Sequence, residues 1–511
     1  MADPPSQHGT EAPTPRNGSG DDGGDWVVLK FGGTSVSSVE RWRTIADQIR
    51  RRRREGLRPL VVCSALSQVS NQLEGLLSQA AAGEDVGSRV ERLRETHRGL
   101  AAALGVDVEE AFEELLPELE RVLLGITLTH EVTPRLRARV LSTGELLSTR
   151  IGVAWLQSQG VRAVWQDARE LLEAEPEPQT AVSEERQFLS ATCSDDLDPA
   201  LEARLRALDA DVIVTQGFLA RGPDGETVLL GRGGSDTSAA YLAARLGARR
   251  LEIWTDVPGL FSANPGRVPE ARLLRRLGYA EASEFAGRGA KILHPRCLGP
   301  VRRHGIPLHV RCTRWPEVEG TVIEDRRAHG HPGILGIASR TDLELVSMDV
   351  EASWQQVGVI ADVTGCFKRL GLSVDLLASS QSNVTLTLDP SANELSEPVI
   401  DALRQELSEI GTPHFEGAAA SVSLVGTSIA DVLHELGPLL ENFEHENVHL
   451  VSHASNDLSF TVVVDQKAAD QLVPALHGKL FASRQADGDL GPTWQELEAQ
   501  AGRAEPARGV H

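Results

Sequence analysis

Apolar and polar residues follow one another along the chain in a pattern that predicts strands and helices in turn. The apolar run from Val27 to Phe31 predicts a strand, and helical spacing from Val39 predicts a helix that ends at Gly56. Further β-prone runs cover residues 59–65, 161–165, 211–218, 251–254 and 307–311. Because helical patterns separate these runs, we expect an α/β fold with a mainly parallel sheet that binds ligands at the carboxyl ends of its strands.

Other segments of this first part can also be interpreted from their pattern. Residues 71–124 predict two or three helices, and Leu141 is expected to open a helix that continues to Leu156. Residues 170–198 are acidic and irregular, which indicates a surface excursion. Asp224-Gly225 predicts a hairpin turn, and a helix is expected over residues 239–246.

From Ile334 onward the pattern changes. The order strand, helix, strand, strand, helix occurs twice, over residues 343–410 and 419–481, and predicts two α+β units. Residues 1–25 are rich in Pro, Gly, Ser and Asp and predict a disordered tail, and residues 486–511 predict a polar tail. We therefore expect a first domain over residues 26–330 and a pair of smaller units over residues 331–485.

Composition narrows the possible partners and compartments. The net charge of −22 argues against nucleic acid or an anionic membrane as the main partner. No apolar run reaches membrane-spanning length, and the N-terminus lacks the features of a signal peptide. The five cysteines are scattered without a metal-ligand or disulfide spacing, so we expect a cytoplasmic protein without a bound structural metal.

The first strand leads into a candidate anion site. It delivers Lys30, then Gly32, Gly33, Thr34 and Ser35, and a helix follows. Glycines between a strand and a helix place backbone N–H groups around an anion, and a lysine adds a point charge. Only five of the 51 basic residues are lysines, which favours a specific use for this one. The lysine precedes the glycines, so the motif is not a Walker A loop, and an ordinary strand-turn-helix remains an alternative.

Two further glycine-rich turns follow strands in the same part of the chain. They are Gly217-Phe218 and residues 231–238, which include Arg232 and Asp236. Together with Lys30 and Lys291, these turns predict a polyanion site suited to phosphoryl transfer from a nucleotide to a second anion. Asp236 would cap a helix, orient Lys30 or hold Mg²⁺.

Five segments, residues 30–35, 142–145, 231–236, 255–259 and 289–295, occur in the order seen in aspartate kinases of the amino-acid kinase family. The resemblance extends from Trp26 to Phe481. It implies a three-layer sandwich around a mainly parallel sheet, followed by two ACT regulatory units, one of which interrupts the other in this family. The implied reaction is phosphorylation of the β-carboxylate of L-aspartate by MgATP to 4-phospho-L-aspartate and ADP, the first step towards lysine, threonine and methionine.

The resemblance also implies roles for individual residues. Lys30 would stabilise the transferring phosphoryl group, and Asp236 would organise the reaction centre. Arg232 can bind a carboxylate with two hydrogen bonds, and Glu145 can pair with the α-ammonium group. The aspartate site would comprise Thr34, Ser35, Ser64, Ser70, Glu145, Phe218 and Arg232. The nucleotide site would comprise Gly32, Gly33, Ser235, Thr255, Asp256, Phe261, Arg267 and Lys291.

Each of these residues also has an ordinary structural interpretation. Ser64 and Ser70 fit turns, Glu145 fits the first turn of a helix, and Phe261 fits a core. The chain reads Asn-Pro-Gly-Arg where many relatives read Asp-Pro-Arg, which displaces Arg267 by one position. Ser70 stands where threonine is usual, and Phe261 replaces a frequent tyrosine.

The second part resembles the units that bind feedback lysine in lysine-sensitive relatives. The pocket would be lined by Val359, Ile360, Val374, Asp375, Ser380 and Gln381. Gln381 replaces a frequent glutamate, so the expected effector is lysine, bound weakly, or another amino acid such as threonine. The resemblance further implies a homodimer or higher oligomer through the ACT units.

Three alternatives remain at this stage. Another amino-acid kinase, acting on glutamate, acetylglutamate, carbamate or a nucleotide, is disfavoured by Glu145, Arg232 and the regulatory repeat. An amino-acid sensor with a degenerate kinase half is disfavoured by intact Lys30 and Asp236. A fusion to homoserine dehydrogenase or a decarboxylase would need more residues than follow Phe481.

Overall fold

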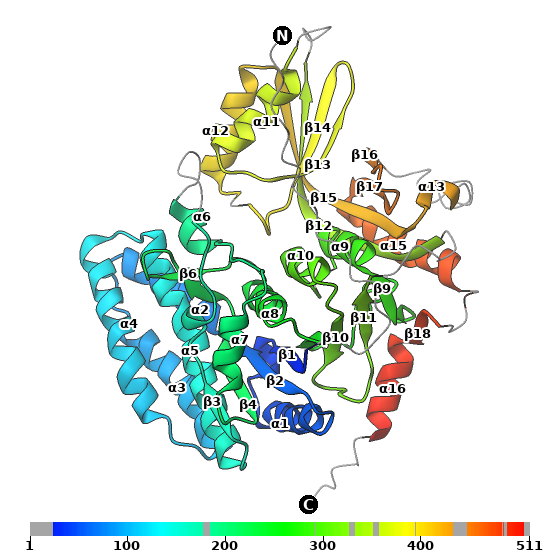
Figure 1. Ribbon diagram of the computed structural model, residues 1–511. Coiled ribbons are helices and arrows are strands. Elements are labelled where there is room, and N and C mark those ends of the chain that lie inside the picture. Colours follow the sequence, from blue (N-terminus) through cyan, green and yellow to red (C-terminus); the bar gives the residue numbers. More distant parts are fainter. Residues whose placement is uncertain are drawn as a thin grey trace, which may run out of the picture.

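The computed structural model describes residues 24–176, 184–290, 292–325, 333–350, 357–393, 395–432, 447–482, 484 and 488–504. Its two parts are each built on one large sheet (Figure 1). The strand order is β3-β4-β2-β1-β7-β10-β11-β9 in the first sheet and β13-β14-β12-β15-β17-β16 in the second. The predicted fold class, a mainly parallel α/β part followed by α+β units, is confirmed.

The first sheet has a parallel core of β1 (Trp26–Phe31), β2 (Arg58–Cys63), β3 (Ala163–Trp165), β4 (Val212–Gln216), β7 (Arg250–Thr255) and β10 (Leu308–Cys312). At one edge β11 (Thr321–Glu324) runs antiparallel to β10 and pairs with β9 (Arg276–Gly278). All six residues of β1 are buried, because helices cover a parallel sheet on both faces. The carboxyl ends of the core strands therefore meet along one edge.

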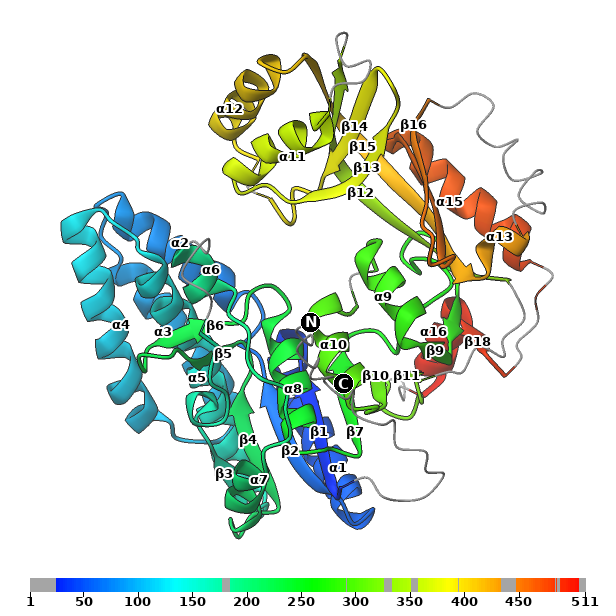
Figure 2. The ribbon, with the colours of Figure 1, turned by 45° about the horizontal axis from the view of Figure 1, so that its top comes forward.

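Two helical layers enclose this sheet. The first layer contains α1 (Val39–Arg54) and α5 (Pro134–Ser158), which pack on β2. The second layer contains α8 (Gly234–Arg245), which packs on β1 and β7, and α10 (Pro295–Arg303), which packs on α8. The predicted helical stretch forms three helices outside α5, namely α2 (Val69–Ala81), α3 (Gly87–Leu104) and α4 (Glu109–Thr129) (Figure 2). Shorter elements are η1 (Gly33–Ser35), η2 (Ala168–Glu170), α6 (Glu184–Leu189), α7 (Pro199–Arg206), β5 (Leu219–Arg221), β6 (Thr227–Leu229), β8 (Arg272–Leu274) and α9 (Tyr279–Gly287).

Two helix starts differ from the prediction. Helix α5 begins at Pro134, seven residues before the expected start at Leu141, because Thr133 accepts a cap hydrogen bond and proline suits the first helical position. Helix α8 begins at Gly234 after Gly233, whose φ of +65° ends the preceding turn. Asp236 therefore lies in the first turn of α8 and is not its cap. The expected hairpin between β5 and β6 is confirmed.

The second sheet contains two α+β units that share long strands. Its elements are β12 (Gly333–Asp349), α11 (Val359–Arg369), β13 (Val374–Ser379), β14 (Asn383–Leu388), α12 (Glu397–Ser408), β15 (Thr412–Thr427), α13 (Ile429–Val432), β16 (Val448–His453), β17 (Ser459–Asp465) and α15 (Gln466–Phe481). The last half of β12 pairs with β14, whereas residues 333–340 pair with the end of β15, which also pairs with β17. The division into consecutive units at 343–410 and 419–481 is therefore wrong, because the second unit takes one strand from before the first.

Arg340 joins this sheet to the first part. Its guanidinium pairs with Asp375 at 2.8 Å and Asp389 at 3.1 Å, and it donates a hydrogen bond to the carbonyl of Gly287 at 2.5 Å. Nearby, a Cβ on Gly289 would lie 2.5 Å from the carbonyl oxygen of Ser339. The end of α9 thus rests directly on β12.

The C-terminal segment returns to the first part of the molecule. Strand β18 (Leu490–Thr493) pairs with β8, and α16 (Trp494–Ala504) follows. The prediction of a polar tail is therefore wrong for these residues. Apolar residues are sparse in this segment, but Leu490, Trp494 and Leu497 pack into the core. No helix among the described residues has the length and apolar character needed to cross a membrane.

Candidate active site

The carboxyl ends of β1, β2, β4 and β7 carry most of the predicted site residues. Lys30 extends from β1, and its Nζ lies 2.6 Å from Oδ1 of Asp236 in the first turn of α8. The two side chains are only 11% and 13% exposed. An ammonium group held by a carboxylate at a helix N-terminus combines a fixed positive charge with free backbone N–H groups, which suits a phosphoryl group.

Glycines allow the loops around this ion pair to approach closely. The N–H of Gly32 donates to the carbonyl of Trp254 at 3.2 Å, and a Cβ on Gly33 would lie 3.0 Å from the carbonyl oxygen of Ala65. A Cβ on Gly233 would lie 2.3 Å from Cβ of His294. The first glycine turn therefore packs on the loop after β2 and on the end of β7, and the turn before α8 packs on the start of α10.

His294 belongs to this site, although the sequence indicated no role for it. Its ring accepts a hydrogen bond from the N–H of Arg296 and caps α10. Burial and the neighbouring charge of Arg296 lower its pKa. A neutral imidazole can therefore lie beside the Lys30–Asp236 pair without adding a further positive charge.

Glu145 is buried in the middle of α5, and not in its first turn. Burial raises the pKa of its carboxyl group to about 8, and a hydrogen bond from the backbone of Ala65 offsets this only in part. Its Oε2 atom has no hydrogen-bond partner among the described residues. A buried carboxyl group with one unpaired oxygen is a ready site for a ligand's ammonium group.

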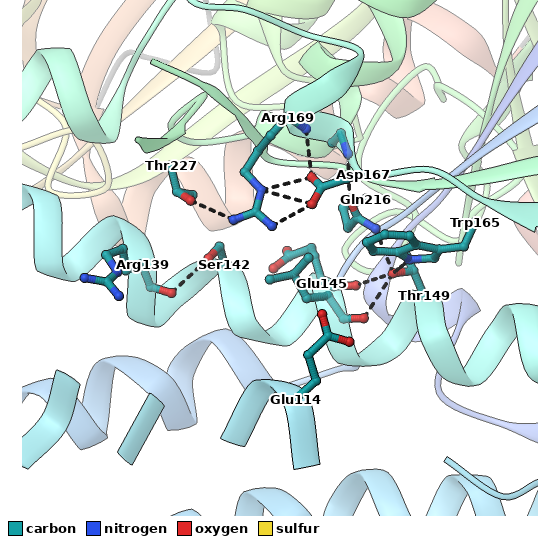
Figure 3. A network of polar contacts seen from close by, with 12 residues as sticks. Glu114, Arg139, Ser142, Glu145, Thr149, Trp165, Asp167, Arg169, Gln216 and Thr227 are labelled. Carbon is teal, nitrogen blue, oxygen red and sulfur yellow. Dashed lines mark hydrogen bonds and ion pairs between the residues drawn. The ribbon is translucent and has the colours of Figure 1, made fainter. Parts of the chain in front are cut away.

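A polar network fixes the part of α5 that carries Glu145 (Figure 3). The hydroxyl of Thr149 donates to the carbonyl of Glu145 at 2.8 Å and accepts from Trp165 at 3.0 Å and Gln216 at 3.1 Å. Ser148 donates to the carbonyl of Ser64 at 2.8 Å. These bonds hold α5 to the ends of β2, β3 and β4, so they set the position of the carboxyl group.

Ser35 does not face the aspartate site as expected, because its side chain is buried in a second network. Its hydroxyl lies 2.5 Å from that of Thr313, which donates to the carbonyl of Thr255 at 2.8 Å. Ser35 and Thr313 are 1% and 2% exposed. Thr313 therefore joins the first glycine turn to the turn after β7. No motif pointed to it, since it is a single hydroxyl that directly follows β10.

Replacing Thr313 with valine should loosen both turns. The change removes the Thr313 hydroxyl from both the Ser35 hydroxyl and the Thr255 carbonyl, which costs about 1 kcal/mol. The Thr255 carbonyl still accepts the Thr313 N–H at 2.9 Å, and the Ser35 hydroxyl still reaches the Trp254 carbonyl at 3.4 Å. We expect a lower thermal unfolding temperature and a raised KM for the nucleotide, measured by calorimetry and steady-state kinetics. Thr313→Ser retains the hydroxyl and is the matched control. Equal behaviour of the valine and serine variants would contradict this role.

The structure brings other predicted residues to the same edge. Phe218 has a φ of +74°, and its N–H is bound by the Ser238 hydroxyl at 2.9 Å. A Cβ on Gly217 would lie 2.6 Å from Cβ of Ser235. Arg232 is exposed and forms no ion pair within the described ranges, which leaves its guanidinium open to a ligand. Thr34, Ser70 and Asp256 are also exposed, and Ser64 and Thr255 are partly buried.

Two predicted nucleotide residues make their contacts away from this site. Phe261 is 5% exposed and packs edge-on against Trp494, so it is a core residue. Arg267 pairs with Asp470 of α15 at 2.9 Å. Lys291 lies outside the described residues. The ordinary interpretation of Phe261 is therefore the correct one.

The predicted effector residues divide into two groups. Val359, Ile360, Ser380 and Gln381 line a cavity of about 160 Å³ together with Val350, Ser379, Asn383 and Val384. Asp375 instead pairs with Arg340, and Val374 packs in the core of the first unit. Both lie at the start of β13, whereas the cavity lies at its end, so they do not line it.

In the part of the chain that the structure describes, no group of three or more His, Cys, Asp or Glu residues could hold a metal ion. All five cysteines are buried and free.

The fold and the site define a class of protein that the comparisons identify. The amino acid kinase family model matches residues 25–312, so the chain belongs to the amino acid kinase family. Aspartokinase 1 (chloroplastic) of Arabidopsis thaliana is 32% identical over 505 residues, which cover 96% of this chain and 85% of the relative. Lysine-sensitive aspartokinase 3 of Escherichia coli K12 is 32% identical over 89% of this chain and 99% of its own length. Within the family, the chain is a member of the aspartokinases.

Solved structures agree with this assignment. The crystal structure of E. coli aspartokinase III in complex with aspartate and ADP has a TM-score of 0.75 and 29% identity, and covers 89% of this chain and 99% of its own. The same enzyme in complex with lysine and aspartate has a TM-score of 0.69 at 30% identity, with 90% and 100% covered. Both matches include the regulatory sheet, which confirms the ACT units expected from the resemblance.

Proposed function

We propose that the protein phosphorylates the β-carboxylate of L-aspartate with MgATP, giving 4-phospho-L-aspartate and ADP. The observation that carries the proposal is the buried Lys30–Asp236 pair, which lies at the strand ends beside two glycine turns. The aspartokinase relatives, one of them solved with aspartate and ADP, support the choice of substrates.

In this mechanism an oxygen of the β-carboxylate attacks the γ-phosphorus of ATP, and the bond from that phosphorus to the ADP oxygen breaks. Lys30 neutralises the charge that the transferring phosphoryl group carries between donor and acceptor. Asp236 holds the ammonium group in place through their 2.6 Å contact. Mg²⁺, when bound with the nucleotide, supplies further charge neutralisation, and Asp236 and Asp256 are the carboxylates we assign to its surroundings.

Each charged group of the aspartate substrate is assigned a different partner. Glu145 binds the α-ammonium group, because its carboxyl group is buried and Oε2 has no other partner among the described residues. Arg232 binds the α-carboxylate with its exposed guanidinium. Ser64 and Thr34 supply hydroxyls at the ends of the first two strands. This division leaves the β-carboxylate facing Lys30.

Measuring ATP turnover with different acceptors tests the proposal. We expect hydroxamate formation with L-aspartate and none above background with glutamate, acetylglutamate or carbamate. Turnover with one of those acceptors and none with aspartate would overturn it. The absence of turnover with every acceptor would instead favour a regulatory protein with an inactive kinase half.

Regulation by an amino acid follows from the second part of the chain. We propose lysine as the effector, bound weakly at the cavity that Ser380 and Gln381 line, and a homodimer or higher oligomer through the ACT units. The E. coli relative named lysine-sensitive supports this choice. The product would then serve the synthesis of lysine, threonine and methionine. Titrating activity against lysine and threonine separates the two effectors.

Arg340 should couple this cavity to catalysis. Strand β13 lines the cavity at one end and is held through Asp375 at the other, and Arg340 also binds the carbonyl of Gly287. We expect Arg340→Gln to raise the lysine concentration for half-inhibition about fivefold or more. Arg369→Gln, which removes an exposed ion pair in the same unit, is the control. An unchanged inhibition curve would exclude this coupling.

A further inference from the structure

The C-terminal segment follows the regulatory sheet in the sequence but pairs with β8 of the catalytic part. Residues 489–497, which we call the C-terminal strap, lie near β9 in both ribbon views (Figures 1 and 2), and their strand β18 pairs with β8. The N–H of Arg275 donates to the carbonyl of Asp489 at 2.8 Å, and the N–H of Trp494 donates to that of Ala271 at 2.9 Å. The strap is therefore bound through its backbone at both ends.

The side chains of the strap reach the segment that follows the turn after β7. The ring of Trp494 meets Phe261 edge-on, with 5.5 Å between centroids, and lies 5.2 Å from the ring of Trp315. Leu497 is 3% exposed in the same cluster. Phe261 lies six residues after Thr255 and forms a β-bridge with Leu273, so Trp494 fixes the far end of that turn.

The other side of this segment is held by the regulatory part. His477 of α15 hydrogen-bonds the Ser262 hydroxyl at 2.9 Å, and Asp470 pairs with Arg267. Residues 261–267 are thus packed between α15 and the C-terminal strap. Lys30 pairs instead with Asp236, and Glu145 lies in α5, so the side chains that hold this segment differ from those on the aspartate side of the site.

We propose that the C-terminal strap positions the turn of residues 255–261 for the nucleotide, with Trp494 as the positioning residue. The inference rests on the proposed function, which places Asp256 near the Mg²⁺ of the nucleotide, and on the resemblance, which implies that Thr255 and Asp256 bind the nucleotide. Because Phe261 is already covered by Trp494, it acts as an anchor for this turn and does not stack on the base. Loss of the strap should therefore weaken nucleotide binding and leave aspartate binding unchanged.

Two shortened chains test the proposal. A chain that ends at Gly488 lacks the strap, and a chain that ends at Ala504 keeps it and is the control. We expect the shorter chain to show a KM for ATP raised roughly 3- to 10-fold, the range for loss of one aromatic contact. Its KM for aspartate should remain within about twofold, since distant sites act independently. Binding of ADP alone, measured by calorimetry, should weaken by the same factor.

Point variants of Trp494 test the proposal even if the shorter chain fails to fold. Trp494→Ala should reproduce the raised KM for ATP, and Trp494→Phe, which keeps an aromatic ring against Phe261, should restore most of it. An unchanged KM for ATP in Trp494→Ala, or an equal rise for both substrates, would overturn the inference. Failure of the proposed function would look different, because the full-length chain would then show no aspartate-dependent turnover.

Discussion

Replacing Lys30 with methionine is expected to lower kcat by about 10³-fold, the loss typical for one group that stabilises charge in a transition state. Methionine fills a similar volume but carries no charge, so the transferring phosphoryl group would lose the stabilising charge of the Lys30 ammonium group. The change also leaves Asp236 buried without its partner. Steady-state kinetics with saturating ATP and aspartate measure the effect.

A second variant separates catalysis from stability in this experiment. Breaking a buried ion pair costs about 3–5 kcal/mol of folding free energy, so Lys30→Met alone should unfold at a lower temperature. The double variant Lys30→Met with Asp236→Asn leaves no unpaired charge and should recover much of that stability. We expect its activity to remain as low as that of Lys30→Met. Recovery of turnover in the double variant would contradict a catalytic role for Lys30.

Aspartate use should depend on pH through Glu145. The pKa of its carboxyl group is raised to about 8 by burial, so at pH 7 the free enzyme holds this group mostly protonated. Pairing with an ammonium group needs the ionised form, and the proton must leave when aspartate binds. We therefore expect kcat/KM for aspartate to fall roughly tenfold for each pH unit below 8 and to level off above it.

The variant Glu145→Gln provides the comparison for this profile. Glutamine has nearly the same shape but cannot ionise, so kcat/KM for aspartate should drop about 100-fold at pH 8 and lose this pH dependence, since a charged hydrogen bond is replaced by a neutral one. The KM for ATP should change little. A native profile that is flat between pH 6 and 8 would show that Glu145 does not carry the ammonium group.

Much of the fold followed from local patterns. The apolar runs identified the core strands because parallel strands are buried on both faces and read as continuous apolar segments. The glycine turns located the Lys30–Asp236 pair, since each turn directly follows a strand end. The start of α5 differs from the expectation because the motif around Glu145 lies in the middle of the helix, whereas the cap signal at Thr133-Pro134 lies further upstream.

The features that the sequence did not predict depend on contacts between residues that are far apart in the chain. Thr313 is an ordinary threonine until the fold places it between Ser35 and Thr255. The C-terminal strap has few apolar residues, and only the free edge of β8 makes it a strand. β12 and β15 each belong to both ACT units, but no local sequence signal marks the point along either strand where one unit ends and the other begins.

The shared strands also have a mechanical consequence. Where the two ACT units meet, β12 and β15 lose their regular register, and Asp342 and Ala418 adopt φ values of +63° and +60° on the neighbouring strands. Residues other than glycine are seldom found in this conformation, which costs about 1–2 kcal/mol each. The irregular positions of β12 and β15 are adjacent, so they form one line of distorted backbone across the sheet. If one unit tilts against the other, the backbone is therefore expected to bend at these residues, which would act as a hinge.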